Sequence, residues 1–502
     1  MTPIAPFQDL PSLVRGHALA RPEAPALRQG ETVLRHADLD ARMDRVAATL
    51  QQAGFKPGDA LAVCAGTSTD YVALFLGALR AGVVVAPLAP SSTAQQLVDM
   101  ARDADARLVF IDNSTAALGV AWPVPTVSLE AAAIESWLHP AGAQPAPVAI
   151  DPAWPFNIIY SSGTTGTPKG IVQPHAMRWA HIQRAGLSGY DAATVTMIAT
   201  PLYSNTTLVC LIPTLAYGGC AVLMPKFDAL QYLQLAEAHR ATHTMLVPVQ
   251  YRRLMAHPEF DRFDLSAFRA KFSTSAPFHA ELKADILKRW PGALTEYYGL
   301  TEGGGTCILF AHLHPTKLHT VGQPAEGHDI RLIDEEGREV PRGESGEVVG
   351  RSPGMMTGYH KRPDLTRAAE WFSTEGLRFI RTGDVGRFDE DGFLTLHDRR
   401  KDMIISGGFN IYPSDLEAVL RPHPAVADVA VVGVPSAEWG ETPVAFCVLK
   451  PGATETAEDL RQWTNAQVGK TQRLHALRLV DELPRSAIGK VLKRELRDLW
   501  VA

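Results

Sequence analysis

The chain has 502 residues, of which 46% are hydrophobic and 20% are charged. That length exceeds a single ordinary core and predicts two or three subdomains. The net charge of -6 gives no reason to expect binding to nucleic acid or to an anionic membrane.

The cysteines and the N-terminal residues indicate a cytoplasmic protein. The five cysteines are odd in number and scattered, with no CxxC pair, which argues against a disulfide framework and a zinc site. The N-terminus "MTPIAPFQDLPSLVRG" lacks a basic region followed by an apolar one, so no signal peptide is expected. The longest apolar region, 71–90, contains Arg80, and we interpret it as a buried helix leading into a strand.

Short apolar runs alternate with helical periodicity through the first 300 residues. A helix is predicted at 69–82, and strands are predicted at 59–65, 107–111, 156–160, 194–200, 220–225 and 243–248. This alternation predicts an α/β chain with parallel sheets covered on both faces.

The pattern of predicted secondary structure changes from about residue 319. Short strands with Asp, Glu and Gly at the turns predict a β-rich subdomain over 319–400, including a hairpin at "DEDG", 389–392. A helix is expected in "YPSDLEAVL", 412–420, with Ser414 as its cap. Strands at 428–435, 442–449 and 476–480 complete a small α+β module. The predicted domains are therefore 1–400 and 401–502, with a boundary near Lys401.

The loop "SSGTTGTPKG", 161–170, follows the apolar run "FNIIY". Glycines let backbone N–H groups approach an anion, and the hydroxyls and the lysine add donors, so the loop suits a phosphate. It is not the common P-loop, because Lys169 lies between Pro168 and Gly170 rather than in a Gly-Lys-Ser/Thr sequence. Taken alone, the loop is also compatible with an ordinary flexible surface loop.

Five sequence segments, taken in their order along the chain, give the clearest indication of function. They are "YSSGTTGTPKG" at 160–170, "EYYGLTEGG" at 296–304, "RTGDVGRFDEDGFL" at 381–394, "DRRKDMIISGGFNIYPSDLE" at 398–417 and "PRSAIGKVLKREL" at 484–496. Together they resemble the motifs of the adenylate-forming superfamily, which includes acyl-CoA synthetases, peptide-synthetase adenylation domains and beetle luciferases. The resemblance covers nearly the whole chain and is closest in type to a stand-alone acyl- or aryl-CoA ligase. It implies a large N-terminal domain of two doubly wound sheets plus the β-rich subdomain, and a small mobile C-terminal lid.

The resemblance implies a site for ATP. The residues it assigns to ATP are Ser161, Ser162, Gly163, Thr164, Thr165, Gly166, Lys169, Tyr298, Gly299, Asp384 and Arg399. Within this set the loop and its lysine would hold the β- and γ-phosphates, and the tyrosine would lie against adenine. The aspartate and the arginine would contact the ribose hydroxyls.

The resemblance also implies the catalytic groups. A carboxylate that attacks the α-phosphate of ATP brings two anions together, so the reaction needs cations and oriented donors around both. By resemblance, Glu302 would hold Mg²⁺, Thr301 would contact the α-phosphate, and Lys490 would bridge the carboxylate and the α-phosphate. Each of these residues taken alone could be an ordinary structural or surface residue.

The second half of the expected reaction depends on the lid. By resemblance, the lid would rotate about Lys401, where many relatives carry aspartate. Gly407 and Gly408 would then open a narrow channel for CoA, since a Cβ there would obstruct it. Trp439 would flank that channel, and a hydrophobic plug between two strands is an equally good interpretation of this tryptophan.

The acid substrate is constrained by three segments. The residues expected to line the acyl pocket are Tyr203, Ser204, Asn205, Thr274 and Gly304. Many acyl-CoA synthetases have histidine where this chain has Ser204, and Thr274 replaces a common glycine. Because these segments contain no lysine or arginine, a second carboxylate on the acid is disfavoured. We expect a compact aryl, alicyclic or medium-chain acid.

The acceptor is expected to be free CoA, because only 12 residues follow Lys490 and they contain no carrier domain. A separate carrier protein remains compatible with the sequence. The main alternative is an amide synthetase that passes the acyl group from the adenylate to an amine or amino acid. A luciferase-like oxygenase and a non-catalytic nucleotide sensor are more distant alternatives, and the intact lysine, glutamate and aspartate argue against the sensor.

Overall fold

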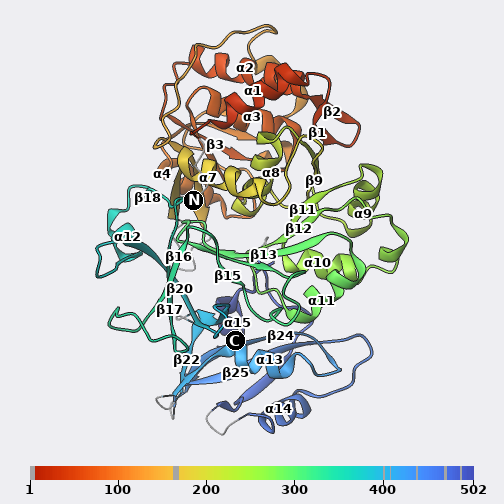
Figure 1. Ribbon diagram of the computed structural model, residues 1–502, viewed down its shortest axis with the longest axis vertical. Helices are drawn as coiled ribbons and strands as arrows, with labels where there is room; N and C mark the ends of the chain where they lie inside the picture. Colours follow the sequence, from red (N-terminus) through yellow and green to blue (C-terminus); the bar gives the residue numbers. More distant parts are fainter. Residues whose placement is uncertain are drawn as a thin grey trace. The chain divides into compact units, whose positions relative to one another are not determined.

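The computed structural model of the protein describes residues 6–161, 169–399, 402–406, 409–436, 439–468, 472–486 and 489–501. Contacts between Cα atoms divide the chain into two units. The larger unit comprises residues 1–319, 324–329 and 351–380, and the smaller unit comprises residues 320–323, 330–350 and 381–502 (Figure 1). This division is not made at residue 400, so the boundary near Lys401 stays a prediction.

One sheet of the chain has seven strands in the order β18-β8-β7-β4-β3-β5-β6. Its strands are β3 (Ala60–Cys64), β4 (Val84–Pro87), β5 (Ala106–Ile111), β6 (Thr126–Ser128), β7 (Pro155–Ser161), β8 (Lys169–Pro174) and β18 (Gly358–Tyr359). The pairs from β7 to β6 are parallel, whereas β8 is antiparallel to both β7 and β18. The buried parallel strands are almost wholly apolar, as strands covered on both faces should be.

A second sheet has nine strands in the order β15-β14-β13-β12-β11-β9-β10-β1-β2. They are β1 (Pro25–Gln29), β2 (Thr32–Arg35), β9 (Val195–Ile198), β10 (Cys220–Leu223), β11 (His243–Leu246), β12 (Ala270–Ser273), β13 (Ala293–Gly299), β14 (Thr306–Phe310) and β15 (Gln323–Pro324). The pairs from β1 through β13 are parallel, and β2 and β14 join antiparallel.

One apolar core joins these two sheets. It contains Val85 and Phe156 from the seven-stranded sheet, Ile198 and Phe272 from the nine-stranded sheet, and most of α3. Helices α3 (Thr69–Arg80) and α8 (Asn205–Ala216) are buried nearly all round, which identifies them as central helices rather than surface ones. Helix α3 also packs against α1 (Leu10–Ala20) and α2 (His36–Gln52), and the three lie side by side in Figure 1.

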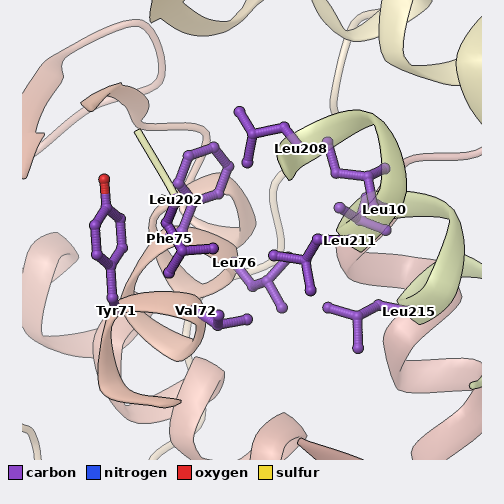
Figure 2. A pocket seen from close by; sticks show the side chains of 10 residues that line it. Leu10, Tyr71, Val72, Phe75, Leu76, Leu202, Leu208, Leu211 and Leu215 are labelled. Carbon is purple, nitrogen blue, oxygen red and sulfur yellow. The ribbon is translucent and has the colours of Figure 1, made fainter. Parts of the chain in front are cut away.

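The packing between α3 and α8 leaves one small hole. Figure 2 shows leucines of α8 pointing toward Val72 and Leu76 of α3, with Leu10 of α1 beside them. The hole offers about 10 Å³ to the centre of a water molecule, roughly the space of one water. Its lining is apolar apart from Tyr71, so it is a packing defect of the core and not a substrate pocket.

The remaining helices of the larger unit cover the sheets or lie in the connections. They are α4 (Ala94–Asp103), α5 (Asn113–Ala116), α6 (Ala131–Trp137), α7 (His175–Gly186), α9 (Ala229–Ala238), α10 (Pro248–Met255), α11 (Ala280–Arg289) and α12 (Pro363–Ala368), with a short 3₁₀ helix at Phe260–Arg262.

The rest of the chain forms two further five-stranded sheets. The first contains β16 (Asp329–Ile333), β17 (Ser345–Arg351), β19 (Glu370–Phe372), β20 (Arg378–Phe388) and β21 (Leu394–Arg399). The second contains β22 (Ile404–Ser406), β23 (Phe409–Ile411), β24 (Val426–Ser436), β25 (Gly440–Leu449) and β26 (Ala476–Leu479). Helices α13 (Pro413–Leu420), α14 (Ala457–Asn465) and α15 (Lys493–Val501) accompany the second sheet.

The α/β architecture with a large N-terminal part and a small C-terminal part is confirmed. The predicted strands are all present within a few residues, and the helix expected at 69–82 is α3. The hairpin at 389–392 joins β20 to β21. The apolar stretch 71–90 is α3 followed by β4, and within the described residues no helix is long and apolar enough to cross a membrane.

The cap predicted at Ser414 is wrong. Helix α13 begins at Pro413, its N-cap residue is Tyr412, and the cap makes no side-chain hydrogen bond. Proline at the first helical position already fixes φ near the helical value and lacks the N–H that a cap would satisfy. Ser414 is therefore inside the first turn.

The close approach of α2 and α3 depends on Gly77. A Cβ on Gly77 would lie 2.5 Å from the Cβ of Val46 and 2.9 Å from the carbonyl oxygen of Met43, both on α2. We expect Gly77→Ala to lower the free energy of unfolding by about 2 kcal/mol, because the two helices must separate. The control is Gly16→Ala in α1, where no atom lies within 4 Å and a gain of about 0.5–1 kcal/mol is expected. Thermal unfolding of both variants tests this, and an unchanged midpoint in Gly77→Ala would contradict the packing.

Candidate active site

The predicted phosphate loop connects two neighbouring strands. Ser161, the last residue of β7, is the Cα partner of Lys169, the first residue of β8. The antiparallel pairing brings the two ends of the loop together at one edge of the strand pair. Of the predicted ATP residues, Ser162, Gly163, Thr164, Thr165 and Gly166 lie outside the described residues.

Lys169 and Glu302 meet around a tyrosine. The Nζ atom of Lys169 lies 5.5 Å from the centroid of the Tyr359 ring, and the Tyr359 hydroxyl donates to Oε1 of Glu302 over 2.8 Å. The backbone oxygen of Glu302 accepts from the N–H of Met356 over 2.8 Å. Burial raises the pKa of Tyr359 above its usual value, and the Glu302 carboxylate adds to the rise, so the phenol stays a donor. The structure therefore brings two predicted site residues into contact with the same tyrosine.

Tyr359 was not among the predicted residues. It belongs to the two-residue strand β18, and its Cα partner on β8 is Ile171. A short connector far along the chain gives no sequence signal of that pairing.

Of the described residues, none form a cluster of three or more His, Cys, Asp or Glu that could hold a metal. Glu302 nevertheless fits Mg²⁺, because Mg²⁺ in nucleotide sites commonly takes one or two carboxylates together with phosphate oxygens.

The turn between β13 and β14 carries the second predicted motif. Tyr298 and Gly299 pair with Cys307 and Thr306, and the six intervening residues include Thr301 and Glu302. Gly303 has φ of +75°, and a Cβ there would lie 2.1 Å from the Gly354 carbonyl oxygen. Only glycine fits this position, so the turn is tightly packed and the position of Glu302 is fixed.

A fully buried arginine lies next to this turn. Arg178 of α7 is 1% exposed, and its Nε and Nη2 atoms donate to Oδ1 of Asn157 over 3.2 and 2.9 Å. Its Nη1 atom donates to Oδ1 of Asn205 over 2.9 Å, and Nη2 also donates to Oε1 of Gln173. The amide of Gln173 in turn donates to the backbone oxygen of Thr301 over 2.7 Å. We call this group the Arg178 network.

The Arg178 network holds a charge among neutral groups. Burial lowers the pKa of Arg178 to about 9, so the guanidinium is still charged at neutral pH. All of its hydrogen-bond partners among the described residues are amide oxygens, which satisfy the donors without neutralising the charge. The network links Asn205, a predicted acyl-pocket residue, to Thr301, a predicted catalytic residue. Sequence reasoning missed Arg178, because an arginine in a helix is usually a surface residue.

Two of the segments expected to line the acyl pocket lie together. Ser204 caps α8 by accepting from the N–H of Thr206, and the hydroxyl of Thr206 is 2.7 Å from that of Ser275. Ser275 has φ of +79°, a left-handed conformation that is strained for serine and is often associated with functional sites. Tyr203 and Thr274 are half-buried beside these groups, whereas Gly304 is buried.

The two residues predicted to contact ribose occupy paired positions on neighbouring strands. Asp384 on β20 and Arg399 on β21 are Cα partners, and the register shifts between Asp384 and Gly386. The N–H of Asp384 donates to the hydroxyl of Thr382 over 3.0 Å, and the carboxylate is half-exposed. Both residues belong to the smaller unit.

Lys490 belongs to the smaller unit and is bonded to Ser486 through its backbone. Its N–H donates to the Ser486 hydroxyl over 3.2 Å, and its carbonyl accepts from the Ser486 N–H over 2.8 Å. Gly489 has φ of +76°, and Nη1 of Arg485 donates to its carbonyl over 2.6 Å. These bonds tie Gly489 and Lys490 to Arg485 and Ser486.

Trp439 is 51% exposed at the connection between β24 and β25. The backbone N–H of Trp439 donates to the Ser436 hydroxyl over 3.2 Å. This exposure does not suit a hydrophobic plug between strands. The next residue, Gly440, is the Cα partner of Ser406, which directly precedes Gly407 in the chain. Lys401, Gly407 and Gly408 themselves lie outside the described residues.

The two large sheets, the hairpin that leads into Lys169 and the acidic turn at Glu302 define an adenylate-forming ligase. The chain belongs to the AMP-binding enzyme family: the model of that family matches residues 14–360, and the model of the AMP-binding enzyme C-terminal domain matches residues 415–490. A feruloyl-CoA synthase from an Amycolatopsis species is 33% identical, over 98% of this chain and 99% of that protein.

Solved structures agree with this family. ATP-bound MatB from Rhodopseudomonas palustris matches with a TM-score of 0.88 and 30% identity, over 98% of this chain and 99% of that one. The amide bond synthetase McbA from Marinactinospora thermotolerans matches with a TM-score of 0.86 and 28% identity, over 98% of this chain and all of that one.

The Arg178 network generates a testable prediction. Arg178→Met should leave Oδ1 of buried Asn157 and Oδ1 of half-buried Asn205 without their donor, whereas Oε1 of Gln173 keeps the amide of Asn157 as a donor. The cost is about 1–3 kcal/mol for a buried group left unsatisfied. We expect a lower unfolding temperature and a fall of at least about 10-fold in kcat/KM for the acid, because Asn205 and Thr301 lose their common support. The control is Arg338→Met, since Arg338 is 73% exposed and pairs with Asp334 on the surface. Equal behaviour of the two variants would contradict a positioning role for Arg178.

Proposed function

We propose that the protein activates a small carboxylic acid with ATP, through an acyl-adenylate, and transfers the acyl group to CoA with release of AMP and pyrophosphate. The observation that carries this proposal is the grouping of Lys169, Tyr359 and Glu302 beside the turn that contains Thr301. A cation and a carboxylate that can hold Mg²⁺ at one place are part of what the attack of a carboxylate on a phosphate requires.

The residue roles follow from that chemistry. Lys169 and the loop before it hold the triphosphate, and Tyr298 lies against adenine. Glu302 is the group that would hold Mg²⁺, which supplies charge neutralisation on the phosphates when bound. Tyr359 keeps the Glu302 carboxylate oriented by the hydrogen bond to Oε1.

The remaining roles belong to the smaller unit. Asp384 accepts from the ribose hydroxyls, with Arg399 opposite it across the strand pair. Lys490 offsets the repulsion between the carboxylate and the α-phosphate during adenylation. A movement of the lid about Lys401 then takes Lys490 away from the acyl group. The same movement brings the CoA channel to that place, and the channel is formed by Gly407, Gly408 and Trp439.

CoA is the acceptor that the smaller unit favours. The exposed side chain of Trp439 stands next to the Ser406–Gly440 pair, immediately before Gly407. An exposed indole at that place suits the wall of a channel for a long flexible thiol. The feruloyl-CoA synthase relative supports the same acceptor. The second candidate, an amide synthetase, is kept because McbA matches over the whole of its length.

A panel of aryl, alicyclic and medium-chain acids with ATP, Mg²⁺ and either CoA or amines tests this function. Mass spectrometry should detect an acyl-CoA and AMP for at least one acid. Formation of an amide without thioester would favour the second candidate. Formation of ADP, or no product with any acid, would contradict both.

The role proposed for Lys490 predicts different effects of its removal on adenylation and on thioester formation. We expect Lys490→Ala to slow adenylation by about 10²- to 10³-fold, the scale of one lost electrostatic stabiliser. The same variant should convert a supplied acyl-adenylate and CoA to thioester at nearly the wild-type rate, because Lys490 acts only in the first step. Single-turnover assays measure each step. The control is Lys450→Ala, which removes an exposed lysine of the same unit. An equal loss in both half-reactions would refute the alternation of Lys490 with the CoA channel.

A further inference from the structure

A stripe of basic side chains runs along one side of α7. Arg178, His181 and Arg184 are three residues apart, so they lie near one another on the helix surface. The helix sequence "HAMRWAHIQRAG" contains no acidic residue. Arg178 is satisfied by its network, but the other two members of the stripe are not.

Arg184 has a charged group without a polar partner. Within the described part of the chain it makes neither a hydrogen bond nor an ion pair, and its only specific contact is with the Tyr297 ring, 5.8 Å from guanidinium carbon to centroid. The residue is half-buried, and burial lowers its pKa. A guanidinium that is partly withdrawn from water normally has a carboxylate or several acceptors around it. This one has an aromatic face only.

Two histidines near Arg184 also have unmet hydrogen-bonding atoms. Nδ1 of His181 and Nδ1 of His328 are buried and have no partner among the described residues. Burial, and secondarily the charges of Arg184 and Arg178, lowers the pKa of His181 far below its usual value. Burial and Arg184 lower the pKa of His328 to about 4. Both rings are therefore neutral at neutral pH, and each can donate one hydrogen bond.

Buried polar atoms in native proteins are nearly all hydrogen-bonded, so the two unpaired histidine nitrogens beside a half-buried guanidinium point to an absent molecule. The groups are one cation and two neutral donors, and the nearby charge of Arg178 has the same sign. We call Arg184, His181 and His328 the basic receptor. An anionic oxygen group is the complement of such a set.

The basic receptor lies close to the proposed adenylation site. Tyr297, which carries the contact with Arg184, directly precedes Tyr298 in β13. Helix α7 also touches the glycine turn, because a Cβ on Gly303 would lie 2.8 Å from Cε of Met177. Arg184 is six residues beyond Arg178, which is about 9 Å along the helix. A substrate with its reacting carboxylate near Thr301 could extend that far along α7.

We propose that the basic receptor binds a second carboxylate at the far end of the acid, so that the substrate class is a dicarboxylic acid. This inference rests on the proposed function. Arg184 would take the carboxylate oxygens with its paired N–H groups, and the histidines would donate to the same oxygens. The sequence disfavoured a second carboxylate because the three pocket segments contain no lysine or arginine. The cation comes instead from α7, outside those segments.

The test uses pairs of acids that differ only in the second charge. Straight-chain dicarboxylic acids of about six to ten carbons and terephthalate are each compared with their monomethyl esters. Acid-dependent exchange of labelled pyrophosphate into ATP gives kcat/KM for each acid. The wild type should prefer the diacid by about 10- to 100-fold, the scale of one charge-assisted recognition.

Variants of Arg184 identify the group responsible. Arg184→Met should lower kcat/KM for the diacid by about 10- to 100-fold and change that for the monoester by less than about 3-fold. Arg184→Lys should restore part of the diacid activity, since it returns the charge without the paired donors. The control is Arg262→Met, which removes a 77% exposed arginine of the same unit. Retained monoester activity shows that Arg184→Met is folded.

Four outcomes would overturn the proposal. A wild-type preference for the monoester would exclude a second carboxylate, and an equal loss for both acids in Arg184→Met would make the arginine structural. Adenylation of monocarboxylic acids without any dicarboxylic acid would reject the basic receptor and leave the proposed function standing. Adenylation of no acid at all would reject both.

Discussion

A positive charge held inside the larger unit by neutral amides is the constraint on which the candidate site depends. Transfer of a guanidinium from water into a protein interior costs several kcal/mol unless it is well hydrogen-bonded. Arg178 satisfies its donors with the side-chain oxygens of Asn157, Gln173 and Asn205 rather than with a carboxylate. The charge is therefore retained, next to the turn where a carboxylate and a phosphate are proposed to meet.

The same network fixes the relative positions of elements that are distant in sequence. Asn157 belongs to β7, Gln173 to β8, Asn205 to α8, and Thr301 to the turn after β13. Strands β7 and β8, helix α8 and the turn that contains Thr301 are thus joined by one hydrogen-bond network. Tyr359 adds a second link, because it contacts Lys169 by its ring and Glu302 by its hydroxyl. The two links do not share a side chain, so each can be altered without removing the other.

The strands were predictable from the sequence, and much of the chemistry around the site was not. Strands β3, β5 and β9 are short, mostly apolar runs because both faces of their sheets are covered. Such runs can be recognised from the sequence alone. The roles proposed for Arg178 and Arg184 depend on which side of α7 faces the interior and on partners from other elements. Tyr359 reaches the site through a two-residue strand, which no local pattern reveals. The N-cap predicted at Ser414 is wrong because the helix already begins at Pro413, which places Ser414 inside the first turn.

The central claim is that the protein makes an acyl-adenylate before any acceptor takes part. Exchange of labelled pyrophosphate into ATP measures this step most directly, since it requires the adenylate to form and to revert. The account predicts exchange that depends on a carboxylic acid and on Mg²⁺ and proceeds without CoA. Exchange that requires CoA, or consumption of ATP to ADP and phosphate without exchange, would contradict it.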